Sequence, residues 1–216
     1  MPVLVRGSWL LLAAPAVIAT LASGSGRAHA EDSVTAPVPP MAPFRRGPLV
    51  EGTLGAYAPL GPLKNVTAPG PWLRLSAGYD FSKWLAVFAT GDAAFLSTGR
   101  APPPPGERAF VIWGFGVGVR VSIPATERLR FPLRFDVGAH KASDDGVLKT
   151  YGFTATNDLG SGTSYGATAG VEWRAPSRHF GVIVEGGVRN DAAFSYAGKT
   201  DKPLAIVAGA SLHYTL

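Results

Sequence analysis

Apolar and polar side chains alternate along most of the chain. The clearest stretch is 73–81, where every odd position is apolar or aromatic and the even positions include Arg74 and Asp80. Alternation with a period of two places one set of side chains on each face of a β-strand. The stretch 129–140 has the same pattern, with arginine and aspartate on its polar face. The pattern therefore predicts strands that carry one apolar and one polar face.

Eight stretches follow this rule. They are 50–58, 73–81, 84–95, 111–123, 129–140, 165–174, 180–189 and 204–216. The alternation is weakest in the first stretch, and Phe88 breaks it in the third. The composition agrees with strands, because 27 glycines and 10% aromatic residues accompany only 16% charged residues, which favours an all-β fold over a helical one.

The polar face of these strands differs from a solvent-exposed face. Much of it is glycine, and its charged residues are arginine, aspartate and glutamate rather than lysine. Buried charges are stable only when they are paired, and the planar guanidinium pairs well with carboxylates. We therefore predict a structural network of paired charges inside a closed lumen. Its members are Glu51, Arg74, Asp80, Asp92, Arg120, Arg130, Arg134, Asp136, Glu172, Arg174, Glu185 and Arg189.

If these charges face the lumen, the apolar face has to lie in hydrocarbon. An arginine on the lipid face costs about 2–4 kcal/mol at mid-bilayer, and a slip of one residue moves the whole charged set there. The total exceeds the stability of a typical domain, which is about 5–15 kcal/mol. The sequence therefore predicts an all-β, eight-stranded antiparallel up-and-down transmembrane β-barrel with a single permitted register. A lumen of this size is filled by side chains, so a large solute pore is not expected.

The connections between the predicted strands alternate in length. Those at 82–83, 124–127 and 175–178 are short, whereas those at 59–71, 96–108, 143–162 and 190–202 are long and rich in turn-forming residues. Outer-membrane barrels combine tight periplasmic turns with longer external loops. Aromatic residues that suit a membrane interface stand beside the short turns: Phe81, Trp84, Trp173, Phe180 and Tyr214. We therefore expect the protein in the bacterial outer membrane.

The N-terminal residues 1–30 have the features of a cleavable export signal. Arg6 precedes an apolar run over 9–22, and Ala28-His29-Ala30 has the small-x-small pattern of a cleavage site. The run is shorter than the roughly 20 residues of a membrane-spanning helix. Residues 31–48 are rich in proline and are predicted to form a periplasmic linker. This division assigns 49–216 to the barrel.

Composition excludes several functional classes. The chain has no cysteine, which excludes disulfides and thiolate metal sites. Its net charge is +5, and removing Arg6 and Arg27 with the signal leaves 18 basic against 15 acidic residues, or +3. These charges are scattered and do not form the basic patch that binds nucleic acid. We predict no catalytic residue, no cofactor and no bound metal.

The strand rhythm, the alternating connections and the C-terminal strand 212–216 together resemble the small outer-membrane barrels of the OmpA and OmpX kind. The resemblance covers 49–216, although Leu216 stands where the family's last residue is normally aromatic. It implies outer-membrane lipid as the surrounding partner. It also implies that a protein partner would bind through the long loops or the N-terminal linker.

Two shorter stretches and the overall loop plan resemble the gliding-motility barrels of the CglE type. One is Ala77-Gly78-Tyr79-Asp80 at a strand end, and the other is Arg178-His179-Phe180 followed by Val184-Glu185. This resemblance implies a surface component of a gliding apparatus.

Two alternatives to a structural or interaction barrel remain open. The first is an outer-membrane lipid-modifying hydrolase, for which His140 with Ser143 and Asp144 or Asp145 supplies suitable residue types. The His-x-Ser spacing of lipid A deacylases is absent, and His140 is expected to face the lumen. The second is a soluble, exported, lipocalin-like carrier, which would have its apolar side chains inside.

Overall fold

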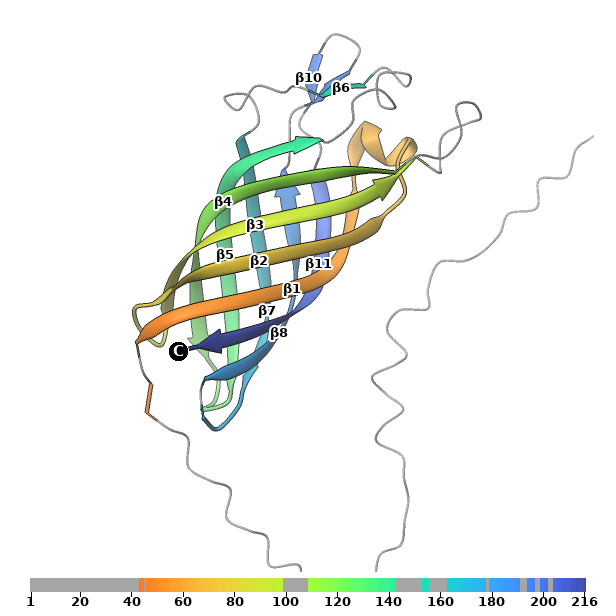
Figure 1. Ribbon diagram of the computed structural model, residues 1–216. Coiled ribbons are helices and arrows are strands. Elements are labelled where there is room, and N and C mark those ends of the chain that lie inside the picture. The colour runs from red at the N-terminus through yellow and green to blue at the C-terminus, as the bar shows by residue number, and fades with distance from the viewer. Residues whose placement is uncertain are drawn as a thin grey trace, which may run out of the picture. The chain divides into compact units, whose positions relative to one another are not determined.

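Eight antiparallel strands close into a barrel in the computed structural model (Figure 1), which describes residues 43–44, 46–98, 109–142, 153–155, 163–177, 179–190, 194–196, 199–201 and 204–216. The predicted eight-stranded barrel is confirmed, and each expected strand overlaps one barrel strand. The barrel strands, in chain order, are β1 (Gly47–Pro59), β2 (Gly70–Asp80), β3 (Leu85–Ser97), β4 (Ala109–Pro124), β5 (Leu129–Ala142), β7 (Thr163–Arg174), β8 (Phe180–Asn190) and β11 (Leu204–Thr215). Strand β1 begins at Gly47, inside the segment expected to be a linker.

The barrel closes where its first strand meets its last. Strand β1 pairs with β11 from Leu49 opposite Thr215 to Pro59 opposite Ala205. Beyond this register, the amide of Leu216 donates to the carbonyl of Pro48 at 2.9 Å. Closure satisfies the backbone groups that an edge strand would leave unpaired.

The two ends of the barrel carry different connections. The turns 81–84 and 125–128 and the described residues 175–177 and 179 lie at one end, which we call the short-turn end. In the first two turns a hydroxyl oxygen accepts a backbone N–H three residues later: Ser82 from Leu85 at 3.1 Å, and Thr126 from Leu129 at 3.0 Å. Such side-chain bonds stabilise tight turns locally. The opposite end, with the longer connections, is the long-connection end.

Side chains alternate between the two faces of the wall as the sequence predicts. Leu75 and Leu212 on the outer face are 71% and 58% exposed, whereas Arg74 on the inner face is 1% exposed. Phe88, which breaks the alternation, faces inward and is buried. The guanidinium of Arg134 lies 3.7 Å from the centre of its ring, a cation–π contact. The break therefore marks an aromatic side chain that belongs to the lumen.

An apolar cluster, here called the apolar plug, fills the lumen at the long-connection end. The 3₁₀-helix η1 (Gly61–Asn65) contributes Leu63, and the hydroxyl of Thr67 fastens this segment by donating to the Leu63 carbonyl at 2.9 Å. The alternation of the sequence predicts apolar side chains on the outer face only, so the plug is a difference between that prediction and the structure. Its members are Tyr57, Leu63, Trp72, Ala94, Leu96, Phe110, Ile112, Ala205 and Val207.

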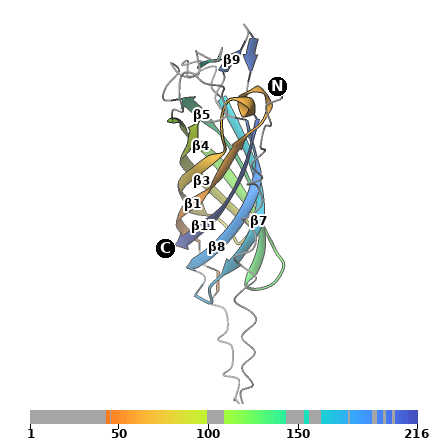
Figure 2. The ribbon, with the colours of Figure 1, turned by 90° about the vertical axis from the view of Figure 1, so that its right-hand side faces the viewer.

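Two of the long connections contain strands that the sequence analysis did not predict. Strands β6 (Phe153–Ala155), β9 (Phe194–Tyr196) and β10 (Lys199–Asp201) form a separate sheet in the order β10-β9-β6. Figures 1 and 2 show this small sheet beyond the long-connection end. Among the described residues, no helix is long and apolar enough to cross a membrane.

Candidate functional site

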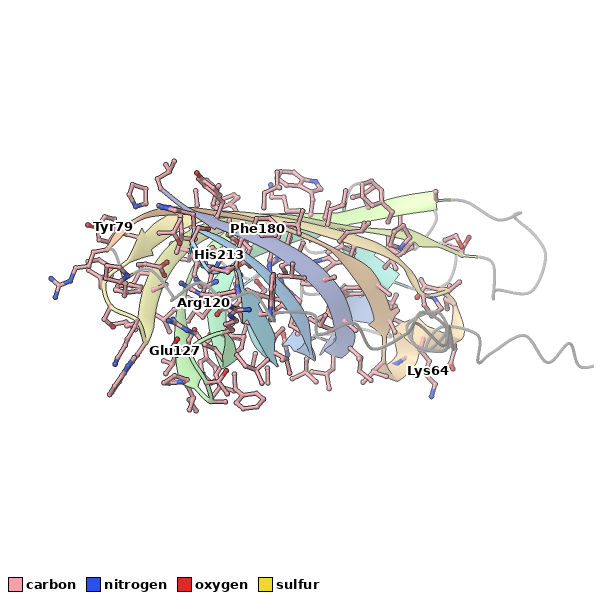
Figure 3. The ribbon with its side chains drawn as sticks, turned by 90° about the horizontal axis from the view of Figure 1, so that it is seen from below. Lys64, Tyr79, Arg120, Glu127, Phe180 and His213 are labelled. Atoms are coloured by element: carbon pink, nitrogen blue, oxygen red, sulfur yellow. The ribbon has the colours of Figure 1, made fainter. Side chains whose placement is uncertain are left out.

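The structure places all twelve predicted charged residues on the inner face of the barrel. Eleven of them are at most 7% exposed, and the side chain of Asp92 is 5% exposed. Figure 3 shows Arg120 within the barrel, towards the end that carries Tyr79 and Glu127 and away from Lys64. We call these twelve residues the charged network.

Glu51 on β1 lies at the centre of the network. Its Oε1 is 2.6 Å from Nη1 of Arg134 and 3.4 Å from Nη2 of Arg74, and its Oε2 is 2.7 Å from Nη1 of Arg120. One carboxylate cannot neutralise three guanidinium groups. Two further acids complete the balance, because Arg74 also pairs with Glu185, and Arg120 pairs with Asp80 at 3.3 Å.

A second group of charges lies nearer the short-turn end. Nε of Arg174 donates to Oε1 of Glu172 at 2.6 Å. His213 lies between two acids, with its ring nitrogens 3.5 Å from Glu172 and 3.6 Å from Asp80. Arg130 donates from Nη1 to the carbonyl of Lys83 at 2.7 Å, which fastens the lumen to the first short turn. His213 stands on the polar face of its strand, although the predicted network omits it.

A third group borders the apolar plug. Arg189 lies 3.4 Å from Asp92 and 3.5 Å from Asp136. Nε2 of His140 is 2.9 Å from Oδ1 of Asp92, and its Nδ1 is 2.5 Å from the hydroxyl of Ser164. Ser164 is not among the residues predicted from the sequence. Its even position in a strand whose odd positions are apolar is the signal that could have found it.

Asp92, His140 and Ser164 are the residue types of a nucleophilic triad. Ser164 is nevertheless completely buried and His140 is 3% exposed, so a substrate carbonyl has no access to the hydroxyl in this structure. In the hydrolase alternative, His140 faces the lumen as expected, whereas Ser143, Asp144 and Asp145 lie outside the described residues. The geometry supports a structural role for the Asp92–His140–Ser164 group. Across the described residues, no group of three or more His, Asp or Glu side chains is arranged to hold a metal ion.

The outer wall has the opposite character to the lumen. The five aromatic residues expected at the interface are all exposed around the short-turn end: Phe81, Trp84, Trp173, Phe180 and Tyr214. A lipocalin-like carrier packs apolar side chains inside and presents polar ones to water. This barrel has charges inside and apolar side chains outside, which excludes that alternative.

A closed eight-stranded antiparallel barrel with an apolar wall and a charged lumen has the architecture of a small outer-membrane β-barrel. Among solved structures, the chain is similar to Neisserial surface protein A, with a TM-score of 0.56 and 13% identity over 80% of this chain and 100% of that chain. It also matches Ail, the attachment invasion locus protein of Yersinia pestis, with a TM-score of 0.38 and 15% identity over 78% of this chain and 98% of that chain. Identities this low show the fold alone.

The sequence matches no protein-family model and no curated protein. The expected resemblance to small outer-membrane barrels is confirmed at the level of the class, whereas the resemblance to the CglE type gains no support from these comparisons.

Replacing Glu51 by Gln should destabilise the barrel, because three buried guanidinium groups then lose their shared carboxylate. Breaking a buried ion pair by removing one partner costs about 3–5 kcal/mol. The measurement is urea unfolding of the protein in lipid vesicles, followed by tryptophan fluorescence. Glu127→Gln on an exposed turn is the matched control, with an expected change within about 0.5 kcal/mol. Equal unfolding midpoints for the two variants would contradict a stabilising role for the network.

Ser164→Ala and His140→Ala should leave the acylation of lipid A unchanged, because neither side chain is accessible to a lipid. Mass spectrometry of lipid A from cells with wild type, each variant or no protein tests this. Ser211→Ala is the control for general destabilisation, since Ser211 is also buried in the lumen but bonds to Thr53 and Glu185 rather than to His140. The hydrolase alternative would be established if lipid A were modified in cells with wild type or Ser211→Ala but not in cells with Ser164→Ala or His140→Ala.

Proposed function

We propose that the protein is a bacterial outer-membrane barrel that acts as a structural and surface-interaction protein. In this proposal, the long connections face the cell exterior and segment 31–48 faces the periplasm. The main observation behind this proposal is that side chains fill the lumen along the described strands. A filled lumen favours a structural protein over a transport channel.

Two features of the lumen support this role. The charged network occupies the part nearer the short-turn end, and the apolar plug occupies the part nearer the long connections. Every member of the plug is at most 2% exposed. A solute would have to separate ion pairs and then cross a packed apolar layer. The free-energy cost of both steps argues against transport.

The outer wall supports a location within a membrane. Thirty large apolar or aromatic side chains among the described residues are at least 38% exposed. Soluble monomers rarely expose a continuous apolar patch larger than a few hundred Å². A wall of this kind is stable in hydrocarbon, and the outer membrane is the bacterial membrane whose proteins cross as closed barrels.

The small sheet β10-β9-β6 supports a binding role for the long connections. It joins residues from two separate connections, because β6 lies in 143–162 and β9 and β10 lie in 190–202. Loops that a rigid scaffold holds in position commonly carry binding function. The proposed partner is a protein at the cell surface.

Single-cysteine labelling tests both location and orientation, and it suits this chain because no native cysteine interferes. A membrane-impermeant maleimide should label Lys64→Cys on intact cells, and Glu127→Cys only after the outer membrane is permeabilised. Val117→Cys on the outer wall should resist the water-soluble reagent in both preparations. Labelling of Val117→Cys, or of Glu127→Cys on intact cells, would contradict the proposed placement.

A finer proposal is that the protein is a component of a gliding apparatus. It rests only on the sequence resemblances at 77–80, 178–180 and 184–185 and on the overall loop plan. Deletion of the gene should then abolish single-cell gliding, and a barrel with altered 143–162 and 190–202 connections should not restore it. Normal gliding in the deletion strain would reject this context and leave the barrel proposal intact.

A further inference from the structure

The outer wall is hollowed by a groove of about 760 Å³ over strands β8, β11, β1, β2, β3 and β4. Two outward-facing glycines, Gly52 and Gly91, lie along it. A Cβ atom added to Gly52 would lie 3.6 Å from its nearest contact, and one added to Gly91 would lie 3.8 Å away. Inward-facing Gly116 differs, because its Cβ would lie 2.5 Å from a carbonyl of the next strand. Steric conflict therefore explains the inner glycine, whereas the outer glycines leave space that a side chain would fill.

Two basic residues, Arg46 and Lys83, lie between the groove and the short-turn end of the barrel or in its turns. Along β1 the outer face continues from Val50 through Pro48 towards Arg46, and Pro48 is paired with Tyr79 on β2. Beyond Tyr79, β2 leads to the turn that contains Lys83. Arg46 and Lys83 are both exposed, and neither forms an ion pair within the described part of the chain. Nζ of Lys83 lies 5.6 Å from the centre of the Trp84 ring, at the level of the interfacial aromatics.

The distance from Arg46 to Gly52 along the membrane normal matches the thickness of one leaflet of a bilayer. Arg46 directly precedes β1 and Gly52 lies six residues further along the chain, a separation of roughly 20 Å at the strand rise of about 3.3 Å per residue. With a strand tilt of about 40°, this distance is about 15 Å along the membrane normal, or half of a hydrocarbon core of about 30 Å. The groove therefore extends from the interface of the short-turn side to the middle of the bilayer.

We propose that the groove binds an acyl chain of an anionic phospholipid from the leaflet at the short-turn end, with Arg46 and Lys83 contacting its phosphate. This site rests on the proposed outer-membrane location. Arg46 and Lys83, which form no ion pair with another described residue, complement a negative phosphate at the headgroup level, and the apolar groove accepts one chain. Tyr214 and Phe180 line the groove on the side of β11 and β8.

Native mass spectrometry of the detergent-folded, full-length protein tests the headgroup contact. The probes are phosphatidylglycerol and phosphatidylcholine with identical chains, and wild type should retain more phosphatidylglycerol. Arg46→Gln and Lys83→Gln should each weaken that binding about fivefold, the effect of one basic residue near an anionic surface. Arg46→Lys should retain the preference. Lys64→Gln, at the opposite end of the barrel, is the matched control and should not change it.

Filling the groove tests the chain contact. Gly52→Leu and Gly91→Leu should lower the retention of both lipids, because the leucine side chain occupies the space of the acyl chain. Ala208→Leu adds the same side chain to the outer face of β11 outside the groove and should have no effect. Unchanged lipid retention in the two glycine variants, an equal effect of Lys64→Gln, or a protein dimer that the glycine variants abolish would overturn the proposal.

Electrophoresis of unboiled samples distinguishes failure of the lipid-site proposal from failure of the proposed outer-membrane function. Wild type and each variant should migrate faster when unboiled, as compact barrels do, and should insert into vesicles. A wild-type protein that does not insert contradicts the outer-membrane proposal itself. An inserted barrel that lacks the lipid preference overturns the lipid site alone.

Discussion

Pairing of buried arginines with carboxylates is the constraint on which the rest of the barrel depends. Glu51 on β1 contacts arginines on β2, β4 and β5, although β1 has only β2 and β11 as neighbours in the sheet. The ion pairs therefore connect strands across the lumen, where no backbone hydrogen bond reaches. A shift of register by one residue would break these pairs and turn the charges towards hydrocarbon. Backbone closure and side-chain pairing thus select the same arrangement.

The lumen changes character along its axis, and Trp72 joins its two parts. Its ring packs in the apolar plug, its Nε1 donates to Asp92 at 3.2 Å, and the guanidinium of Arg74 lies 4.9 Å from the ring centre. The plug therefore does not pack against unpaired charges, because an amphipathic side chain lies between the two. A lumen filled in this way leaves the ends and the outer wall as the surfaces that can bind other molecules.

Sequence alone could predict the strands and the inward charges because both follow from one period of two. The plug could not be predicted in the same way. Phe110 and Ile112 face inward while Val111 and Trp113 face outward, so that part of β4 is apolar on both faces and the alternation disappears. The pairing of His140 with Ser164 depends on the register between β5 and β7, and the sharing of Glu51 depends on geometry across the lumen. Neither is encoded in the local pattern of one strand.

Glycines on the inner face of the wall allow adjacent strands to approach closely, whereas glycines on the outer face leave open space. In the sequence, only the position of a glycine in the alternation distinguishes the two kinds. Gly116 faces inward opposite Gly138, where adjacent strands approach too closely for a Cβ atom. Gly52 and Gly91 face outward, where a side chain would fit. Close packing of adjacent strands explains why position 116 is glycine. It does not explain the glycines at 52 and 91, because no part of the barrel occupies the space beside them. In the proposed lipid site, an acyl chain that lies along the wall occupies the space that Gly52 and Gly91 leave in the groove.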